Sequence, residues 1–244
     1  MYLFVLGRDK ELAKVELVSY LKTQNIQYKL KDHNTNFVAL DLAEGLNFQK
    51  IIDDLGGTIR IAKVIDSKTA ISNSFLEKLD LYLPKKFNYT VSSLNLANDE
   101  LKAIRETLKN HFKSEKFKAT YKTHDKDFLD PSNYFSSEIN NGLELIVIRH
   151  GDEYIFAQSV ASTNTTNYKF KDTKRPKTLL THSTSFRLAQ IMVNLLGLKS
   201  NSRIVDPFCG TGTILIEAML RGYDVIGIDN NSYLIHLCKN NLKW

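Results

Sequence analysis

The segment that most constrains the fold runs from Ile204 to Thr213 and reads IVDPFCGTGT. A short apolar strand pattern ends at an aspartate, and a glycine-containing turn then leads into a helical pattern over Thr213–Arg221. A second strand pattern, Tyr223–Asp229, and a second helical pattern, Asn231–Leu242, follow directly. Strands that alternate with helices are typical of a parallel α/β sheet. We therefore expect residues 177–244 to open an α/β domain.

The turn itself indicates a ligand site at the carboxyl end of the first strand. Glycines let a ligand approach the backbone closely, and Asp229 ends the next strand, where an acid meets ribose hydroxyls in adenosine-binding units. A dinucleotide fingerprint would need a glycine at position 215, which is Leu, and no Gly-Lys-Ser/Thr of a P-loop is present. Asp206 before the turn suits a ligand with a positive charge and no pyrophosphate.

These features favour S-adenosylmethionine as the cofactor. The alternative, a tight turn that binds nothing, is disfavoured because the run DPFCGTGT is much more specific than a lone G-x-G. The residues that we expect to bind the cofactor belong to the turn and to the end of the second strand: Asp206, Pro207, Phe208, Cys209, Gly210, Thr211, Gly212, Thr213, Asp229 and Asn230.

The first 160 residues have a different texture, with strand and helix patterns in mixed order. Strands are expected at Tyr2–Leu6, Phe37–Leu42, Thr58–Ile65, Tyr89–Leu96 and Phe117–Tyr121, and as a hairpin on either side of Gly151-Asp152. In Thr58–Ile65 the alternation places Arg60 opposite the apolar face. Helices are expected from Asp9, over Phe48–Leu55 and most clearly over Asp99–Phe112. This pattern indicates an α+β region.

Residues 161–176 are polar and are interpreted as a linker between the two regions. Beyond it, Phe186–Leu196 is expected to be helical, with Leu188, Ile191, Met192 and Leu195 facing inward. The predicted domains are therefore residues 1–160, the linker 161–176, and a partial domain over residues 177–244.

Composition supports a small protein of the cytoplasm. Hydrophobic residues make up 43% and charged residues 25% of 244, which is typical of globular chains, and no apolar run is long enough to span a bilayer. The N-terminus does not read as a signal peptide, and two cysteines form no disulfide framework. The six histidines show no zinc-ligand spacing, so no metal site is expected.

The net charge of +6 is unevenly distributed, because residues 1–160 have no net charge and residues 161–244 carry the whole excess. Two stretches are nevertheless rich in bases, and closely spaced cations can follow a phosphate backbone. A solvated helix face and a polar linker explain them equally well. The candidate RNA-binding residues are Lys102, Arg105, Lys109, Lys113, Lys118, Lys122, Lys169, Lys174 and Arg175.

The run Asp206–Thr213 with Asp229-Asn230 resembles motifs I and II of S-adenosylmethionine-dependent methyltransferases. Arg175-Pro176 and Phe186–Leu195 resemble the segment before motif I in THUMP-domain tRNA guanosine-N2 methyltransferases. Two N-terminal runs fit the same family: Phe4–Arg8 and Leu55–Ala62.

This resemblance implies a THUMP-like, RNA-binding N-terminal region, tRNA as the partner, and a Rossmann-like domain that binds S-adenosylmethionine. It implies methylation of the exocyclic amine of a tRNA guanosine, at position ten in tRNA numbering. The chain departs from the family where THSTS, beginning at Thr181, replaces a shorter proline-bearing turn. We still expect Thr181, His182 and Ser183 to contact the cofactor.

The resemblance also places catalysis in an Asp/Asn-Pro-Pro-Tyr/Phe motif after a later strand. The four prolines, at positions 84, 131, 176 and 207, are never adjacent, so this motif is absent and no catalytic residue is assigned. We expect the chain to be a truncation, from a partial or split gene, that is inactive without a C-terminal catalytic half or a partner subunit.

Two other functions stay open. The chain could act as a non-catalytic tRNA-binding module, or belong to a methyltransferase for ribosomal RNA or DNA, because charge does not distinguish between nucleic acids. Methyl transfer from labelled cofactor to tRNA, measured with and without the missing C-terminal half, separates the first alternative, and competition binding with tRNA, rRNA fragments and DNA separates the second.

Overall fold

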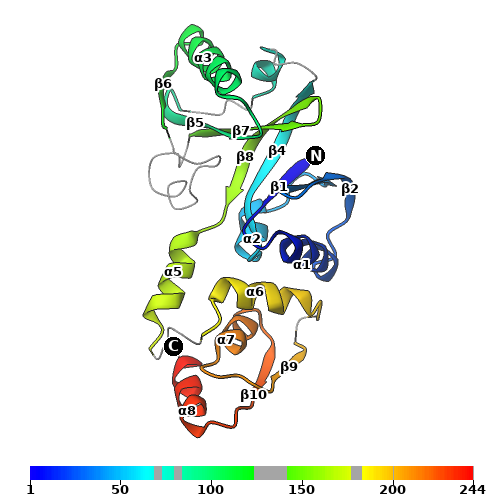
Figure 1. Ribbon diagram of the computed structural model, residues 1–244, viewed down its shortest axis with the longest axis vertical. Coiled ribbons are helices and arrows are strands. Elements are labelled where there is room, and N and C mark those ends of the chain that lie inside the picture. Colours follow the sequence, from blue (N-terminus) through cyan, green and yellow to red (C-terminus); the bar gives the residue numbers. More distant parts are fainter. Residues whose placement is uncertain (69–72, 80–83, 124–141, 177–182, 200, 244) are drawn as a thin grey trace.

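The computed structural model describes residues 1–68, 73–79, 84–123, 142–176, 183–199 and 201–243 (Figure 1). They form a mixed eight-stranded sheet with the order β2-β3-β1-β4-β8-β7-β5-β6, and a parallel pair, β10-β9. In the described residues, the chain first forms β1 (Tyr2–Leu6), α1 (Lys10–Thr23), β2 (Tyr28–His33), β3 (Phe37–Leu42), α2 (Phe48–Asp53), β4 (Thr58–Lys68), η1 (Asn73–Lys78), β5 (Lys86–Leu94), α3 (Asn98–Ser114), β6 (Lys118–Tyr121) and β7 (Leu143–His150).

The remaining elements continue to the C-terminal end of the described chain: β8 (Glu153–Ser162), α5 (Thr165–Lys174), α6 (Phe186–Leu195), β9 (Arg203–Asp206), α7 (Thr213–Leu220), β10 (Asp224–Gly227) and α8 (Ser232–Asn241). Figure 1 shows β4 and β8 extending from the upper part of the molecule, where α3 lies, to its middle, where α1 and α2 lie. Helices α6, α7 and α8 lie with β9 and β10 at the lower end (Figure 1).

The first half of the large sheet is covered by α1 and α2. Strand β1 is buried along its whole length, and Phe4 packs with Leu17 and Leu21 of α1, all three completely buried. Asp9 occupies the N-cap position of α1 as expected, although its side chain makes no capping hydrogen bond with the described residues. Burial of this apolar face provides the main stabilisation of the first half.

The second half of the sheet is covered by α3, whose apolar face was clear from the sequence. Ile104, Leu108 and Phe112 are buried on that face. They pack against β5 and β7, which pair in parallel, while β7 and β8 form the expected hairpin. Gly151 has a φ of +61° at its turn, a value that glycine adopts without strain.

Strands β4 and β8 join the two halves into one sheet through an antiparallel register that reaches from Arg60↔Ser162 to Lys68↔Tyr154. Strand β4 has 11 residues, three more than the alternation predicted. Arg60, expected opposite the apolar face of this strand, is nonetheless buried, with its side chain 1% exposed. Its Nε lies 2.8 Å from Oε2 of Glu144, and this buried carboxylate offsets the cost of removing the guanidinium from water.

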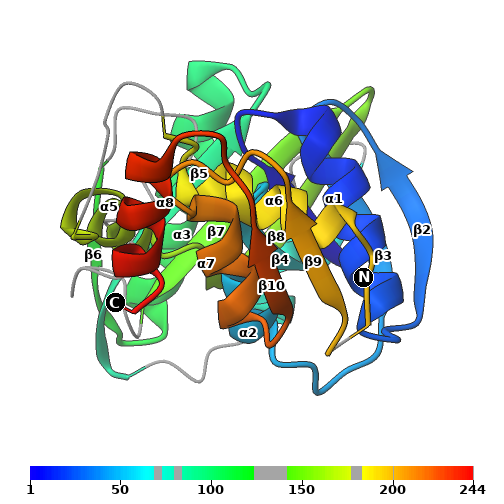
Figure 2. The ribbon, with the colours of Figure 1, turned by 90° about the horizontal axis from the view of Figure 1, so that it is seen from below.

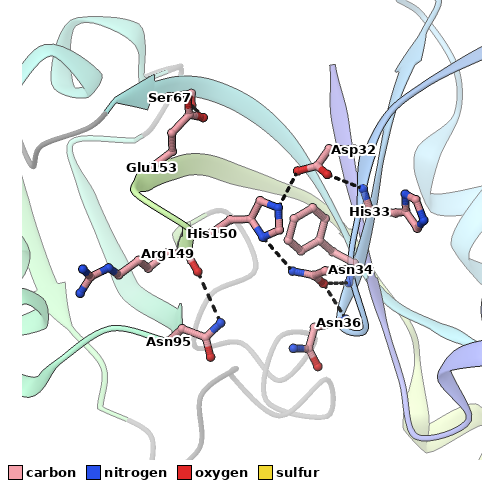
Figure 3. A network of polar contacts seen from close by, with 10 residues as sticks. Asp32, His33, Asn34, Asn36, Ser67, Asn95, Arg149, His150 and Glu153 are labelled. Atoms are coloured by element: carbon pink, nitrogen blue, oxygen red, sulfur yellow. Dashed lines mark hydrogen bonds and ion pairs between the residues drawn. The ribbon is translucent and has the colours of Figure 1, made fainter.

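The tips of the two halves also touch, through a polar network at the β7–β8 hairpin (Figure 3). Nε2 of His150 lies 3.3 Å from Oδ2 of Asp32, and its Nδ1 lies 3.4 Å from Nδ2 of Asn34. Asn34 Oδ1 accepts from the backbone N–H of Asn36 and Phe37, which fixes the β2–β3 turn. The ring of Phe37 meets His150 edge-on at 5.6 Å. The two halves of the sheet are thus joined by side-chain contacts between the β2–β3 turn and the β7–β8 hairpin as well as by the β4–β8 pairing.

The segment interpreted as a linker contains helix α5, which the sequence analysis did not predict. The Asn164 side chain caps it by accepting from Asn167 N. Lys171 reaches Glu217 of α7 at 2.7 Å, and Asp172 Oδ1 accepts from Phe186 N, so α5 is attached to the C-terminal elements.

Helix α6 lies where expected but is turned differently. Leu188 and Met192 are exposed, whereas Gln190 and Asn194 are buried, so the inward placement of those two apolar residues was wrong. The reason is that α6 packs on two sides at once, against α7 and against α1 (Figure 2). Val193 packs against Ala218 of α7, whereas the amide of Asn194 donates to Glu16 of α1 and the amide of Gln190 donates to the backbone at the end of α2.

No helix in the described ranges combines the length and the apolar character needed to cross a membrane.

Candidate cofactor site and nucleic-acid surface

The site predicted from the sequence lies at the carboxyl end of the parallel pair. Strand β9 ends at Asp206 beside Gly227 of β10. Two backbone hydrogen bonds then join the loops that leave the strands: Ile228 N donates to Asp206 O at 2.8 Å, and Cys209 N donates to Ile228 O at 2.9 Å. The sequence thus places both acidic ends of the motif at one edge of the sheet, where α/β folds bind ligands.

Two glycines shape the turn between β9 and α7. Gly210 has a φ of +50° and Gly212 a φ of +88°, both in the left-handed region. A side chain on Gly212 would lie 2.6 Å from the sulfur of Cys238. A Cβ on Gly210 would meet no atom of the described residues within 4 Å. The backbone at Gly210 therefore faces open space, as a ligand-binding turn requires.

The two carboxylates hold the turn in shape. Asp206 Oδ1 accepts from Phe208 N at 3.0 Å, and Asp229 Oδ2 accepts from Gly210 N at 2.9 Å. The second oxygen of Asp229 accepts from Asn231 N at 2.9 Å. Each carboxylate is partly exposed and keeps free lone pairs for further donors, such as an ammonium or hydroxyl group.

Helix α8 supports the turn from behind. Cys238 and Cys209 are 4% and 6% exposed, and Asn241 Nδ2 donates to Thr211 O at 2.9 Å. Burial raises the pKa of both thiols, that of Cys238 to about 12. Protonated, buried thiols are poor nucleophiles, so the geometry gives these cysteines a packing role.

Arg175 takes a place that differs from the sequence expectation of a base presented to RNA. Its side chain is 5% exposed, Nη1 donates to Thr213 Oγ1 at 2.5 Å, and the guanidinium lies over the ring of Phe186. This hydrogen bond holds Thr213, the first residue of α7, which directly follows the glycine turn. The polar surroundings of Arg175 in sequence gave no sign of this, because its partners are 11 and 38 residues away.

A small hollow of about 80 Å³ opens at the turn, lined by Ser183, Thr184, Asp206, Phe208, Cys209, Gly210, Thr211, Thr213 and Ile214. Of the three upstream candidates, Ser183 is therefore at the site, with its Oγ 3.4 Å from Thr211 Oγ1. Thr181 and His182 lie outside the described residues. Phe208 is 86% exposed at the rim, and Pro207 and Asn230 are exposed as well.

The candidate RNA-binding bases of the N-terminal region gather at the other end of the molecule, on α3 and β6 (Figure 1). Four lysines and three aromatic residues line a hollow of about 310 Å³ there: Lys109, Lys113, Lys116, Lys118, Tyr89, Phe112 and Phe117. Lys102 is exposed on α3, whereas Lys122 is partly buried and Arg105 packs over the ring of Tyr121 at 5.0 Å. Lys169 and Lys174 are exposed on α5.

Among the described residues, histidines, cysteines and acids form no cluster that could hold a metal ion.

Comparison with known proteins bears mainly on the C-terminal segment. Residues 178–243 match the family described as RMKL-like, methyltransferase domain. Over 61 residues the chain is 51% identical to tRNA (guanine(10)-N2)-dimethyltransferase of Methanothermobacter thermautotrophicus, an alignment that covers 25% of this chain and 18% of that protein.

Two solved structures share the fold of most of the chain. TrmN from Thermus thermophilus aligns over 100% of this chain and 71% of its own, with a TM-score of 0.58 and 14% identity. SMU.472, solved in complex with SAH, aligns over 99% of this chain and 71% of its own, with a TM-score of 0.54 and 15% identity.

The C-terminal part of the chain is therefore homologous to archaeal tRNA (guanine(10)-N2)-dimethyltransferases. The homology is partial, because the aligned segments span between 12% and 35% of those relatives. The segment that matches contains the glycine turn and both carboxylates.

Proposed function

We propose that this chain provides the cofactor-binding turn and the RNA-holding region of an S-adenosylmethionine-dependent tRNA (guanine-N2) methyltransferase that modifies guanosine ten. The observation that carries the proposal is the turn itself: Asp206 and Asp229 flank an open, glycine-lined edge within the segment homologous to tRNA dimethyltransferases. The N-terminal region, residues 1–160, is then the THUMP-like part that holds the tRNA.

The residues at the turn fit S-adenosylmethionine. The cofactor carries an ammonium and a sulfonium, both positive, and a ribose with two hydroxyl donors. Asp206 would accept from the ammonium and Asp229 from the ribose, while the open backbone at Gly210 leaves room for the ligand. When bound, the cofactor supplies the methyl group, and these residues hold it in place.

The lysines of α3 and β6 fit a polyanion. Four ammonium groups around one hollow can replace condensed counterions of an RNA backbone, and the partly exposed Phe117 offers a ring edge to a base. We assign tRNA as the partner of this surface from the homology of the C-terminal segment.

Methyl transfer needs a group that accepts from the guanine amine, and the sequence of residues 1–244 contains no adjacent prolines of the family's catalytic motif. We therefore propose that residues 1–244 bind cofactor and tRNA, and that transfer depends on a segment that carries this motif.

The cofactor half of the proposal is tested by titrating residues 1–244 with S-adenosylmethionine in a calorimeter. Asp229→Ala should weaken binding roughly tenfold or more, because it removes a charged acceptor. Asp224→Ala, which removes an exposed carboxylate paired with Arg203 on the same two strands, is the matched control and should bind as the unaltered protein does. Equal affinity in all three, or no binding, would overturn the cofactor assignment and leave the tRNA-binding module.

The RNA half is tested by binding of labelled tRNA at several salt concentrations. Replacing Lys109 and Lys113 by Ala should lower affinity and reduce the salt slope by about one for each lost phosphate contact. Replacing Lys22 and Lys29, exposed on α1 and β2, is the control with the same change of charge. Equal losses in both variants would show binding without a defined surface. Stronger competition by rRNA or DNA would favour those substrates instead.

A further inference from the structure

The loop Asp53–Gly57, which begins at the last residue of α2, is held through its backbone by side chains from the C-terminal elements. The donors come from residues 113 to 167 positions later in the chain. Four consecutive carbonyls accept: Asp53 O from Gln190 Nε2 at 2.7 Å, Asp54 O from Asn194 Nδ2 at 2.8 Å and Arg221 Nη2 at 2.6 Å, Leu55 O from the Tyr168 hydroxyl at 3.5 Å, and Gly56 O from Arg187 Nε.

The N–H groups of the same loop point the other way, to a buried acid on α1. Glu16 is completely buried, and its carboxylate accepts from Gly56 N at 2.8 Å and from Gly57 N at 2.7 Å. It also accepts from Asn194 Nδ2 at 2.6 Å. Burial raises the pKa of Glu16, and these three donors oppose the rise because they stabilise the charged form. One carboxylate thus joins α1, the loop and α6.

Gly56 and Gly57 are required because neighbouring atoms leave no room for a side chain at either position. A Cβ on Gly56 would lie 2.4 Å from Arg187 O, and a Cβ on Gly57 would lie 2.4 Å from the Cβ of Ala13. Neither glycine has a positive φ, so close approach of α6 and α1 is the reason for glycine here. The Leu55–Ala62 run, conspicuous in the sequence but unrelated to the cofactor turn, acquires a role from this packing.

The contact continues to the cofactor turn through α7. Asn194 Oδ1 accepts from Arg221 Nη1 at 2.7 Å, and Arg221 caps the C-terminal end of α7. Thr213, at the other end of this eight-residue helix, directly follows the glycine turn. Hydrogen bonds are directional, so a polar contact of this kind fixes orientation where an apolar one would allow sliding.

We propose that the loop Asp53–Gly57, together with Glu16, Asn194 and Arg221, is a positioning joint that holds the cofactor turn at one fixed separation and orientation from the RNA-holding region. The role given to the joint rests on the proposed function, whereas the attachment of the two regions to each other does not depend on it. Asn194 and Glu16 act through the backbone and through α7, and they touch neither cofactor nor RNA.

The test measures the separation directly. Spin labels are attached at Lys102→Cys on α3 and Lys239→Cys on α8, two positions whose side chains are exposed. Pulsed electron paramagnetic resonance then measures the distribution of distances between the two labels. The unaltered joint should give one narrow distribution. Asn194→Ala should broaden it about twofold or more, because the link from Glu16 to Arg221 is lost. Ile104→Val, a mild truncation in the α3 core, lowers stability without touching the joint and should leave the width unchanged.

Hydrogen exchange of the unaltered protein provides a second measurement that needs no variant. The amides of Gly56 and Gly57 should exchange as slowly as those in the middle of α1, although they lie in a loop. Fast exchange of these amides, or an unchanged distance distribution in Asn194→Ala, would overturn the joint. Neither experiment contains cofactor or RNA, so each outcome is independent of whether the proposed function holds.

Discussion

At the scale of single residues, two glycines of one turn are required for different reasons. Gly212 combines a φ of +88° with contact to Cys238, whereas Gly210 has a positive φ and open space beside it. Changing either to Ala introduces left-handed strain of about 1–2 kcal/mol. Only Gly212→Ala adds a steric overlap.

We therefore expect Gly212→Ala to lower the free energy of unfolding clearly more than Gly210→Ala does. Gly210→Ala should instead show its main effect on cofactor affinity, because its methyl group would occupy the open side of the turn. Denaturant unfolding and calorimetric titration of both variants measure the two effects. The same loss of stability in both would contradict the overlap at Cys238.

The two cysteines give a prediction of chemical inertness. Both are buried and burial raises the pKa of each, so the thiolate fraction at pH 8 is very small. A thiol reagent such as Ellman's should label neither in the folded protein and both in guanidinium chloride. Rapid labelling of the folded protein would show that α8 does not cover the turn.

The place and role of a residue were predictable where they depend on its neighbours in the sequence, and were not predictable where its burial depends on distant partners. Asp206 and Asp229 were predicted from their places at the ends of two strand patterns; Asp206 ends β9, whereas Asp229 lies two residues after β10 ends at Gly227, and both carboxylates accept hydrogen bonds from the turn. Arg60 was expected opposite the apolar face and Arg175 was assigned to RNA, because charged side chains are usually exposed. Each is instead buried beside a partner, Glu144 or Thr213, that no short sequence window contains.

At the scale of elements, the β9–β10 pair has one covered and one open face. Ile204 is 7% exposed and packs with Val193 and Ala218, whereas Val205 and Ile226, paired in register, are 52% and 43% exposed. Parallel strands are normally covered on both faces. The open face is therefore an apolar surface in contact with solvent.

We expect residues 1–244 to bind a hydrophobic dye and to aggregate through this face. Threonine at both Val205 and Ile226 should reduce dye binding with little change in unfolding free energy, because these side chains are already half exposed. Ile204→Thr, the same kind of substitution at a buried position of β9, is the matched control. It should lower the free energy of unfolding by about 2–4 kcal/mol. Undiminished dye fluorescence in the double variant would locate the exposed apolar surface elsewhere.

Elements with a strong period were predicted well. Strand β9 ends at Asp206 as expected, and the β7–β8 hairpin and α3 follow the sequence pattern closely. Helix α5 was missed because its polar run has no apolar stripe, and its stability comes from a cap and from contacts to α7. Helix α6 was found but turned wrongly, since it buries Gln190 and Asn194 against backbone carbonyls.

At the scale of the whole molecule, the large sheet and the small pair should differ in stability. The large sheet has eight strands with apolar clusters on both faces, while β9 and β10 have four residues each and an open face. Local opening free energies follow the buried apolar contacts of a segment.

Hydrogen exchange should therefore show slow amides in β1, β4 and β8, and amides of β10 that exchange about a hundredfold faster or more. Helix α6 should follow the large sheet because the positioning joint attaches it to α1 and the loop Asp53–Gly57. Uniform protection throughout would mean that the molecule opens as a single unit, contrary to this distribution of contacts.

The order of the strands in the large sheet could not be predicted from the sequence. Strand β4 pairs with β8 across about one hundred positions, with Arg60 opposite Ser162 at one end, and this pairing forms the middle of the eight-stranded sheet in the described part of the chain. Local patterns specify that a strand forms and which face is apolar, but its partner depends on the packing of the complete chain.

Helix α6 has a consequence for how such a chain can evolve. Its apolar side belongs to the core with α7 and β9, and its amide side belongs to the loop Asp53–Gly57. A methyltransferase segment transferred by recombination to another N-terminal region would leave Gln190 and Asn194 without their carbonyl partners. The two regions are therefore inherited most easily together, and substitutions at Glu16, Gly56 or Asn194 should be accepted only when the facing residue changes with them.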